Sequence, residues 1–170
     1  TMLYCPYGQL TALNVGQNVN LISIICGDNQ LTSLDVSQNG NLTTLSCPNN
    51  QLTALDVSQN GKLTVLECYS NQLKSLNLAN GNNTNFKNTG SYPAVNATRN
   101  PSLTCIQVDN GFDPTGLTGR QEWKKDDGAV WNNDPENPCG SAAIISINLS
   151  VNNLLLLIGR QRSEERRVGK

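Results

Sequence analysis

The chain of 170 residues contains no histidine, only one methionine, and aromatic residues at 5% of its composition. The absence of histidine removes the commonest general base and the commonest metal ligand, which disfavours an enzyme. With an apolar share of 37%, the chain has little material for a layered core, but it suits stacked aliphatic columns. The most apolar stretch, residues 142–158, is interrupted by serine and asparagine, so we expect no membrane span.

The charges are divided unevenly along the chain. Residues 1–140 hold 7 Lys and Arg against 11 Asp and Glu, whereas residues 141–170 hold 5 against 2. A mildly acidic body disfavours electrostatic binding to nucleic acid. The sequence contains no GxSxG motif, no phosphate-binding loop and no recognisable catalytic carboxylate pair. We therefore expect no catalysis by this chain and no cofactor.

Four cysteines and four leucines recur with a period of 21 residues. They are Cys5, Cys26, Cys47 and Cys68, and Leu10, Leu31, Leu52 and Leu73. A fixed period of this length is the signature of a solenoid. Each unit divides into the halves LxxLxCxxNx and LxxLxVxxNxx, whose alternating apolar residues predict a short strand followed by a turn. The predicted fold class is a β-rich solenoid with short parallel strands.

The repeated asparagines and cysteines have structural explanations. We expect Asn29, Asn50 and Asn71 to form a ladder in which each side chain pairs with backbone groups at the turn, and a glycan or metal role is the alternative. Asn18, Asn39 and Asn60 hold the matching place in the second half-repeat. We expect the cysteine column to consist of buried free thiols, because it presents one thiol per coil and no tetrahedral set. No metal site is therefore expected.

The pattern LxxLxCxxNxLxxLDVxxN resembles the leucine-rich repeat, in the nested 21-residue form of secreted bacterial proteins similar in style to internalins. The match runs from Thr1 to Leu78, and LNLANGNNTNF and ATRNPSLTCIQVD resemble the terminal repeat and C-terminal cap of that group. The resemblance implies about four coils and an irregular cap. Residues 1–82 would be N-terminally truncated repeats, 83–140 the terminal repeat and cap, and 141–170 a non-repeat tail that is disordered or artefactual.

Two cysteines and two tryptophans lie in the cap-like region. The resemblance favours a disulfide between Cys105 and Cys139, which would indicate an oxidising, extracellular setting; two unrelated thiols are the alternative. Trp123 and Trp131 lie between these cysteines. We expect them to plug the exposed end of the leucine columns, and a carbohydrate site beside the neighbouring charged residues is the alternative.

Comparison of the repeats with one another locates the surface that changes. Outward positions of the second half-repeat scarcely vary, whereas those of the cysteine-containing strand differ from coil to coil. Residues that vary on the surface of a constant scaffold can determine binding specificity without affecting the fold. The predicted binding face consists of Tyr4, Ile25, Ser46, Glu67 and Tyr69. Drift on an unused face is the alternative.

These observations favour an extracellular or bacterial cell-surface module that binds a protein or a glycan, in adhesion or surface interaction. The alternative is a non-catalytic accessory region of a larger secreted enzyme. Thr11, Thr32 and Thr53 align in a manner that would suit an ice- or mineral-binding array, but Lys74 interrupts their column. No nucleic acid partner is expected.

Overall fold

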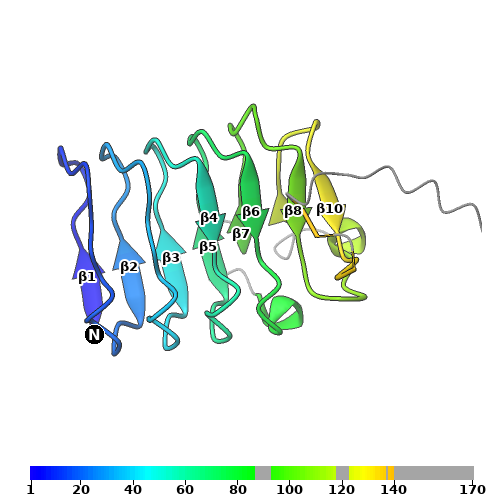
Figure 1. Ribbon diagram of the computed structural model, residues 1–170, viewed down its shortest axis with the longest axis horizontal. Coiled ribbons are helices and arrows are strands. Elements are labelled where there is room, and N and C mark those ends of the chain that lie inside the picture. Colours follow the sequence, from blue (N-terminus) through cyan, green and yellow to red (C-terminus); the bar gives the residue numbers. More distant parts are fainter. Residues whose placement is uncertain (87–92, 118–122, 137, 140–170) are drawn as a thin grey trace, which may run out of the picture. The chain divides into compact units, whose positions relative to one another are not determined.

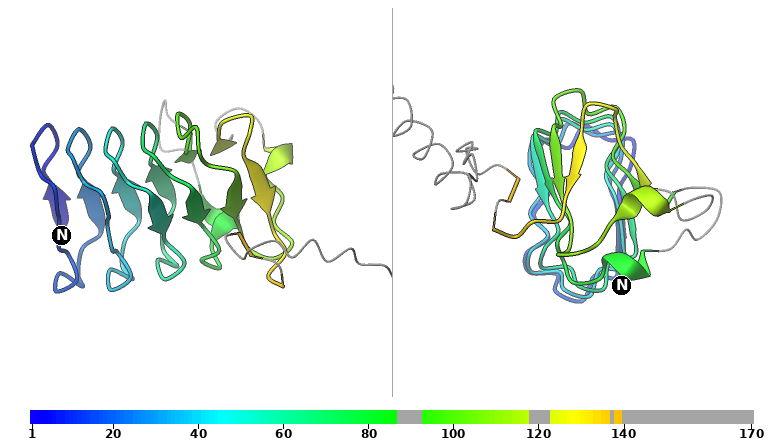
Figure 2. Two further views of the ribbon diagram at one scale, coloured as in Figure 1. Left: turned by 45° about the horizontal axis from the view of Figure 1, so that its top comes forward. Right: turned by 90° about the vertical axis from the view of Figure 1, so that its right-hand side faces the viewer.

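The computed structural model describes residues 1–86, 93–117, 123–136 and 138–139, which belong to one unit from Thr1 to Gly140. The predicted tail, residues 141–170, lies outside the described residues. The unit is a stack of coils that carry short parallel strands (Figure 1). Viewed along the stack, the coils nearly superpose, with the strands gathered on two opposite sides (Figure 2).

Two parallel sheets run along the stack, and every strand has two or three residues. The first sheet contains, in order, β1 (Met2–Tyr4), β2 (Ser23–Ile25), β3 (Thr44–Ser46), β5 (Val65–Glu67), β7 (Val95–Asn96) and β9 (Trp123–Lys124). The second contains β4 (Ala54–Asp56), β6 (Ser75–Asn77), β8 (Cys105–Gln107) and β10 (Val130–Asn132). The predicted solenoid of short parallel strands, a leucine-rich-repeat fold, is confirmed.

Two short 3₁₀ helices complete the described secondary structure. They are η1 (Asn83–Asn85) and η2 (Pro114–Gly116), and each lies between a second-sheet strand and the next first-sheet strand. With three residues each, neither of these two helices could cross a bilayer. No helix among the described residues is long and apolar enough to do so.

The core consists of apolar columns that run through successive coils. Strand register aligns Leu3, Ile24, Leu45, Leu66, Val95 and Trp123 in the first sheet, and Leu55, Leu76, Ile106 and Trp131 in the second. Ile24, Leu45 and Leu66 are completely buried. Burial of such a side chain contributes roughly 1.5–3 kcal/mol, and a coil obtains it only when neighbouring coils cover both of its faces.

The coils continue further than the sequence suggests. Successive core positions are 21 residues apart as far as Leu66, but Val95 follows after 29 (95 − 66) and Trp123 after 28 (123 − 95), in an unbroken strand register. Most of the additional residues fall, in sequence, between β6 and β7 and between β8 and β9, the two intervals that contain η1 and η2. The expected irregular cap therefore contains two further coils, and a tryptophan closes each sheet's column.

An asparagine ladder joins each coil to the preceding one. The Nδ2 of Asn50 donates to the carbonyl oxygens of Cys26 at 3.1 Å and Cys47 at 3.2 Å, and its Oδ1 accepts from the backbone N of Leu31 at 3.0 Å. Asn29, Asn71 and Asn100 make equivalent bonds. All of these side chains are buried, and the amides of Asn50, Asn71 and Asn100 satisfy buried backbone groups.

The carboxylate of Asp126 takes the place of a backbone acceptor at the turn that contains the last ladder asparagine. In an interior coil, the backbone N of Asn49 donates to the carbonyl oxygen of Tyr69 in the next coil at 3.1 Å. At the corresponding turn, the backbone N of Arg99 donates to Oδ1 of Asp126 at 2.8 Å, and that of Asn100 to Oδ2 at 2.6 Å. The Asp126 side chain therefore replaces the backbone acceptor of a further coil.

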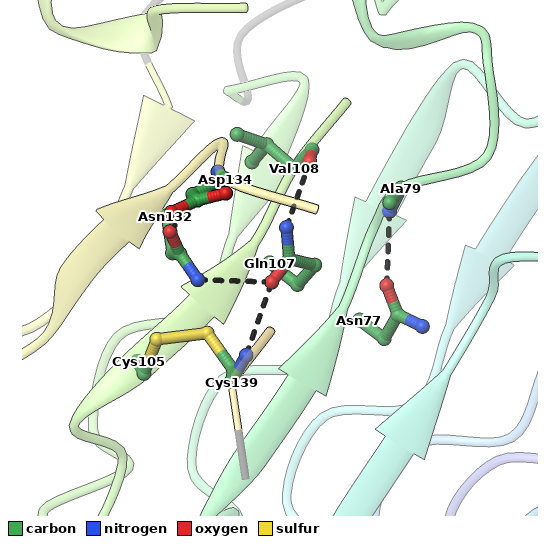
Figure 3. The surroundings of a disulfide bond; sticks show 8 residues. All are labelled: Asn77, Ala79, Cys105, Gln107, Val108, Asn132, Asp134 and Cys139. Carbon is green, nitrogen blue, oxygen red and sulfur yellow. Dashed lines mark hydrogen bonds between the residues drawn. A yellow bond between two sulfur atoms is a disulfide. The ribbon is translucent and has the colours of Figure 1, made fainter. Parts of the chain in front are cut away.

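A disulfide between Cys105 and Cys139 secures the end of the described chain (Figure 3). Cys105 follows Ser75 in the outward row of the second sheet, so the bridge lies outside the sheet. Gln107, 7% exposed, supports the bridged segment. Its Oε1 accepts from the backbone N of Cys139 and from Nδ2 of Asn132, both at 3.0 Å.

Candidate binding surface

The predicted binding face lies on the outside of the first sheet. Inward leucines alternate with outward side chains, because successive residues of a strand point to opposite faces. One outward row consists of Met2, Ser23, Thr44 and Val65, and the other of Tyr4, Ile25, Ser46, Glu67, Asn96 and Lys124. We call the second of these the variable row. Four of the five predicted residues share it, and Tyr69 lies two residues beyond Glu67.

The accessibility of these side chains differs along the row. Tyr4 is 61% exposed, and Ile25, Glu67 and Tyr69 are partly exposed. The row begins with aromatic and aliphatic side chains and ends with the exposed cation of Lys124. A partner that covered the row would therefore meet an apolar region followed by a polar one.

Ser46 requires a correction to the predicted face. Its side chain is 8% exposed, and its Oγ donates to Oε2 of Glu67 at 2.7 Å. The strand register places this small side chain between the larger Ile25 and Glu67. Ser46 therefore orients Glu67 and has little surface of its own to offer a partner.

The backbone beside the variable row is closely packed where the chain leaves the strand. Gly27 and Pro48 are buried, and a Cβ at Gly27 would lie 2.9 Å from Cγ of Pro48. Such a distance admits no side chain larger than glycine without a shift of Pro48. Tyr69, the next residue in this column, therefore stands beside a turn that is fixed by packing.

Sequence reasoning missed two members of the variable row, Asn96 and Lys124. They follow Glu67 by 29 and a further 28 residues, so a 21-residue comparison passes over them. The coil of Asn96 could have been aligned through Asn100, because Asn100 occupies the same ladder position as Asn71.

The cysteine column lies inside the stack, beneath this surface. All four thiols are free; Cys26, Cys47 and Cys68 are buried, and Cys5 is partly exposed. Loss of solvation raises the pKa of Cys26 and Cys68 to about 12, and burial also raises the pKa of Cys47 well above its ordinary value. Within the described ranges, no three cysteine or carboxylate side chains gather as metal ligands.

The repeats, the apolar columns and the asparagine ladder together define a leucine-rich-repeat solenoid with a variable outward surface on one sheet. No family model matches the chain, and no curated protein matches it. The chain is similar to a solved structure of the functional domain of InlJ from Listeria monocytogenes, which includes a cysteine ladder. The identity is 34% and the TM-score 0.49; the match covers 66% of this chain and 27% of that one.

Proposed function

We propose that this chain is a protein-binding module that presents the variable row to its partner. The observation that carries the proposal is a contrast between two kinds of position: inward residues and ladder asparagines repeat from coil to coil, while the accessible outward residue changes from Tyr4 to Ile25 and, two coils further on, to Glu67. Residues that vary over a constant scaffold can change the specificity of a surface without affecting the fold.

The dimensions and chemistry of the row support a protein partner. Neighbouring strands lie about 4.8 Å apart, so the first four side chains span about 14 Å along the stack. Tyrosine is enriched among the residues that contribute most to binding energy in interfaces. Tyr4 and Tyr69 stand at the two ends of this segment and can anchor a partner that also contacts Ile25 and Glu67.

We further propose an extracellular or bacterial cell-surface location, with a role in adhesion or surface interaction. Disulfides such as Cys105–Cys139 persist in oxidising compartments. The four other thiols would be at risk of oxidation there. Burial and raised pKa values protect Cys26, Cys47 and Cys68, because the thiolate is the reactive form.

The proposed role is binding without catalysis by this chain. A cysteine nucleophile requires a lowered pKa and access to substrate, and Cys26, Cys47 and Cys68 have the opposite properties. Asp35 and Asp56, which occupy equivalent places in successive coils, each accept the backbone N–H two residues further on. They are thereby engaged in closing turns.

The test immobilises the full chain on beads and measures saturable binding to extracellular matrix proteins and to intact cell surfaces. We expect Tyr4→Ala and Ile25→Lys each to weaken binding about tenfold. Ala54→Lys, which adds the same exposed cation to the second sheet, serves as the matched control and should leave binding unchanged. Protease treatment of the cell surface should abolish binding, whereas glycosidase treatment should not. Equal loss in the Ile25 and Ala54 variants would refute the assignment of this face.

A further inference from the structure

The last coil contains a pocket that the proposed function does not use. It has a volume of about 400 Å³ and lies between the turn of η2 and strand β10. Its wall includes six side chains that carry an aromatic ring, a charge or an amide: Phe112, Asp113, Lys125, Asp127, Trp131 and Asn133. Its volume falls within the range of small-molecule sites, roughly 300–1,000 Å³.

The aromatic wall of this pocket is fixed from behind. Trp123, 6% exposed, packs against Phe112 with ring centroids 4.9 Å apart and meets Trp131 edge to face at 5.7 Å. Trp131 itself is only half-buried. If Trp131 only closed the core column, its ring could be completely buried. The part of the side chain that remains accessible is available to a ligand.

The polar groups around the aromatic wall include both donors and acceptors. Oδ1 of Asp113 accepts from the backbone N and Oγ of Thr115, which leaves Oδ2 available. The exposed carboxylate of Asp127 accepts no hydrogen bond within the described part of the chain. Nδ2 of Asn133 donates to the carbonyl oxygen of Phe112 at 3.2 Å, so its Oδ1 can accept.

Lys125 supplies the donors. Its Nζ lies 6.0 Å from the centroid of the Trp131 ring and donates to the carbonyl oxygen of Asp126 at 3.3 Å. An ammonium group carries three N–H donors, so two remain. Because its stem is flexible, Lys125 can move from the ring to the edge of a bound molecule while it keeps contact with the pocket.

We propose that this pocket binds a neutral saccharide. A sugar ring has an apolar C–H face that can stack on Trp131 and Phe112, and hydroxyls that both donate and accept hydrogen bonds. Asp113, Asp127 and Asn133 accept from these hydroxyls, and Lys125 donates to them. The two carboxylates repel an anionic ligand, and a cationic ligand would compete with Lys125 for the ring. The pocket lies on the last coil and shares no lining residue with the variable row.

Tryptophan fluorescence tests the proposal directly, because the chain has two tryptophans, of which Trp131 lines the pocket and Trp123 packs against it. The full chain is titrated with glucose, galactose, mannose, N-acetylglucosamine and their β-linked disaccharides, and with glucose 6-phosphate as a charged comparison. We expect a saturable change with at least one neutral sugar, with a dissociation constant of about 10 mM or lower. Glucose 6-phosphate should bind more weakly than the neutral sugars.

Variants then locate the binding site. We expect Asp127→Asn to weaken binding about fivefold or more, and Trp131→Phe about threefold, while far-UV circular dichroism stays unchanged. Glu136→Gln is the matched control, because it removes one exposed negative charge from the same coil without bordering the pocket. Trp131→Ala should remove binding. If Trp131→Ala fails to fold, the weaker binding expected of Trp131→Phe is the test of the role of this ring. Absence of saturable binding up to roughly 50 mM of every neutral sugar, or equal binding by all variants, would overturn the proposal.

Discussion

Removal of one ladder asparagine should destabilise the whole stack. In Asn50→Ala, the backbone N–H of Leu31 loses its acceptor in a buried position, which costs about 1–3 kcal/mol. The carbonyl oxygens of Cys26 and Cys47 each keep a second partner, Asn29 and Asn71 respectively. Losing the Asn50 bonds to them therefore adds only about 1 kcal/mol. We expect the free energy of unfolding to fall by about 2–4 kcal/mol.

The same reasoning predicts a gradient along the ladder. Asn29→Ala frees the backbone N–H of Leu10, a residue that is 37% exposed, and water can replace the lost partner there. We expect a loss of about 1–2 kcal/mol for this variant, less than for Asn50→Ala. Asn20→Ala removes an exposed asparagine and should change stability by less than about 0.5 kcal/mol.

Urea unfolding followed by far-UV circular dichroism measures these differences. With a denaturant slope of about 2 kcal/mol/M, Asn50→Ala should lower the midpoint by about 1–2 M. Asn50→Asp is the most specific comparison, because it keeps the acceptor for Leu31 but replaces the amide donor by an oxygen that faces carbonyl groups. The reasoning is refuted if Asn50→Ala matches Asn20→Ala, or if Asn50→Asp is as stable as the original chain.

Four further predictions concern the cysteines and the last coil. Iodoacetamide should modify Cys5 first and leave Cys26, Cys47 and Cys68 unmodified until unfolding, as peptide mass spectrometry can check. Because folding raises the pKa of Cys26 and Cys68 from 9.0 to about 12, the unfolded chain loses thiol protons first. Stability should therefore fall as the pH rises from about 9 to 12, less so in Cys26→Ala. Reduction of Cys105–Cys139, which closes a separation of 34 residues, should cost about 4 kcal/mol by loop entropy, measured as a lower urea midpoint. Asp126→Ala should cost about 1–3 kcal/mol by freeing two backbone donors; an equal loss in Asp127→Ala, whose carboxylate bonds no described backbone group, would contradict this.

The 21-residue period was sufficient to predict the strands of the cysteine-containing half, the inward columns and the position of the ladder, because each of these depends on alternation and stacking alone. The prediction of a strand in every second half was wrong for residues 12–14 and 33–35, since among the four regular repeats only Ala54–Asp56 and Ser75–Asn77 form strands there. The buried state of Ser46 could not be read in the same way, since it depends on the side chains in the coils above and below it. Sequence reasoning placed the alternation correctly but could not weigh the sizes of neighbouring outward residues.

The last two coils and the pocket were harder to predict for a different reason. Their strands follow turns of altered length, so register is visible only after the chain has folded. Asp126 shows the same limit, because its role as an acceptor for Arg99 and Asn100 joins residues 26 and 27 positions apart. The tryptophans indicated that the stack ends in this region, whereas the charged residues around Trp131 became a pocket only through the turn of η2.

The coil between Leu66 and Val95 is eight residues longer than a repeat (29 − 21), yet its strand pairs in the same register as the others. Lengthening this turn has therefore not disturbed the sheet. A protein built in this way can gain segments at one edge of a coil, by mutation or by design, while its columns and ladder remain intact.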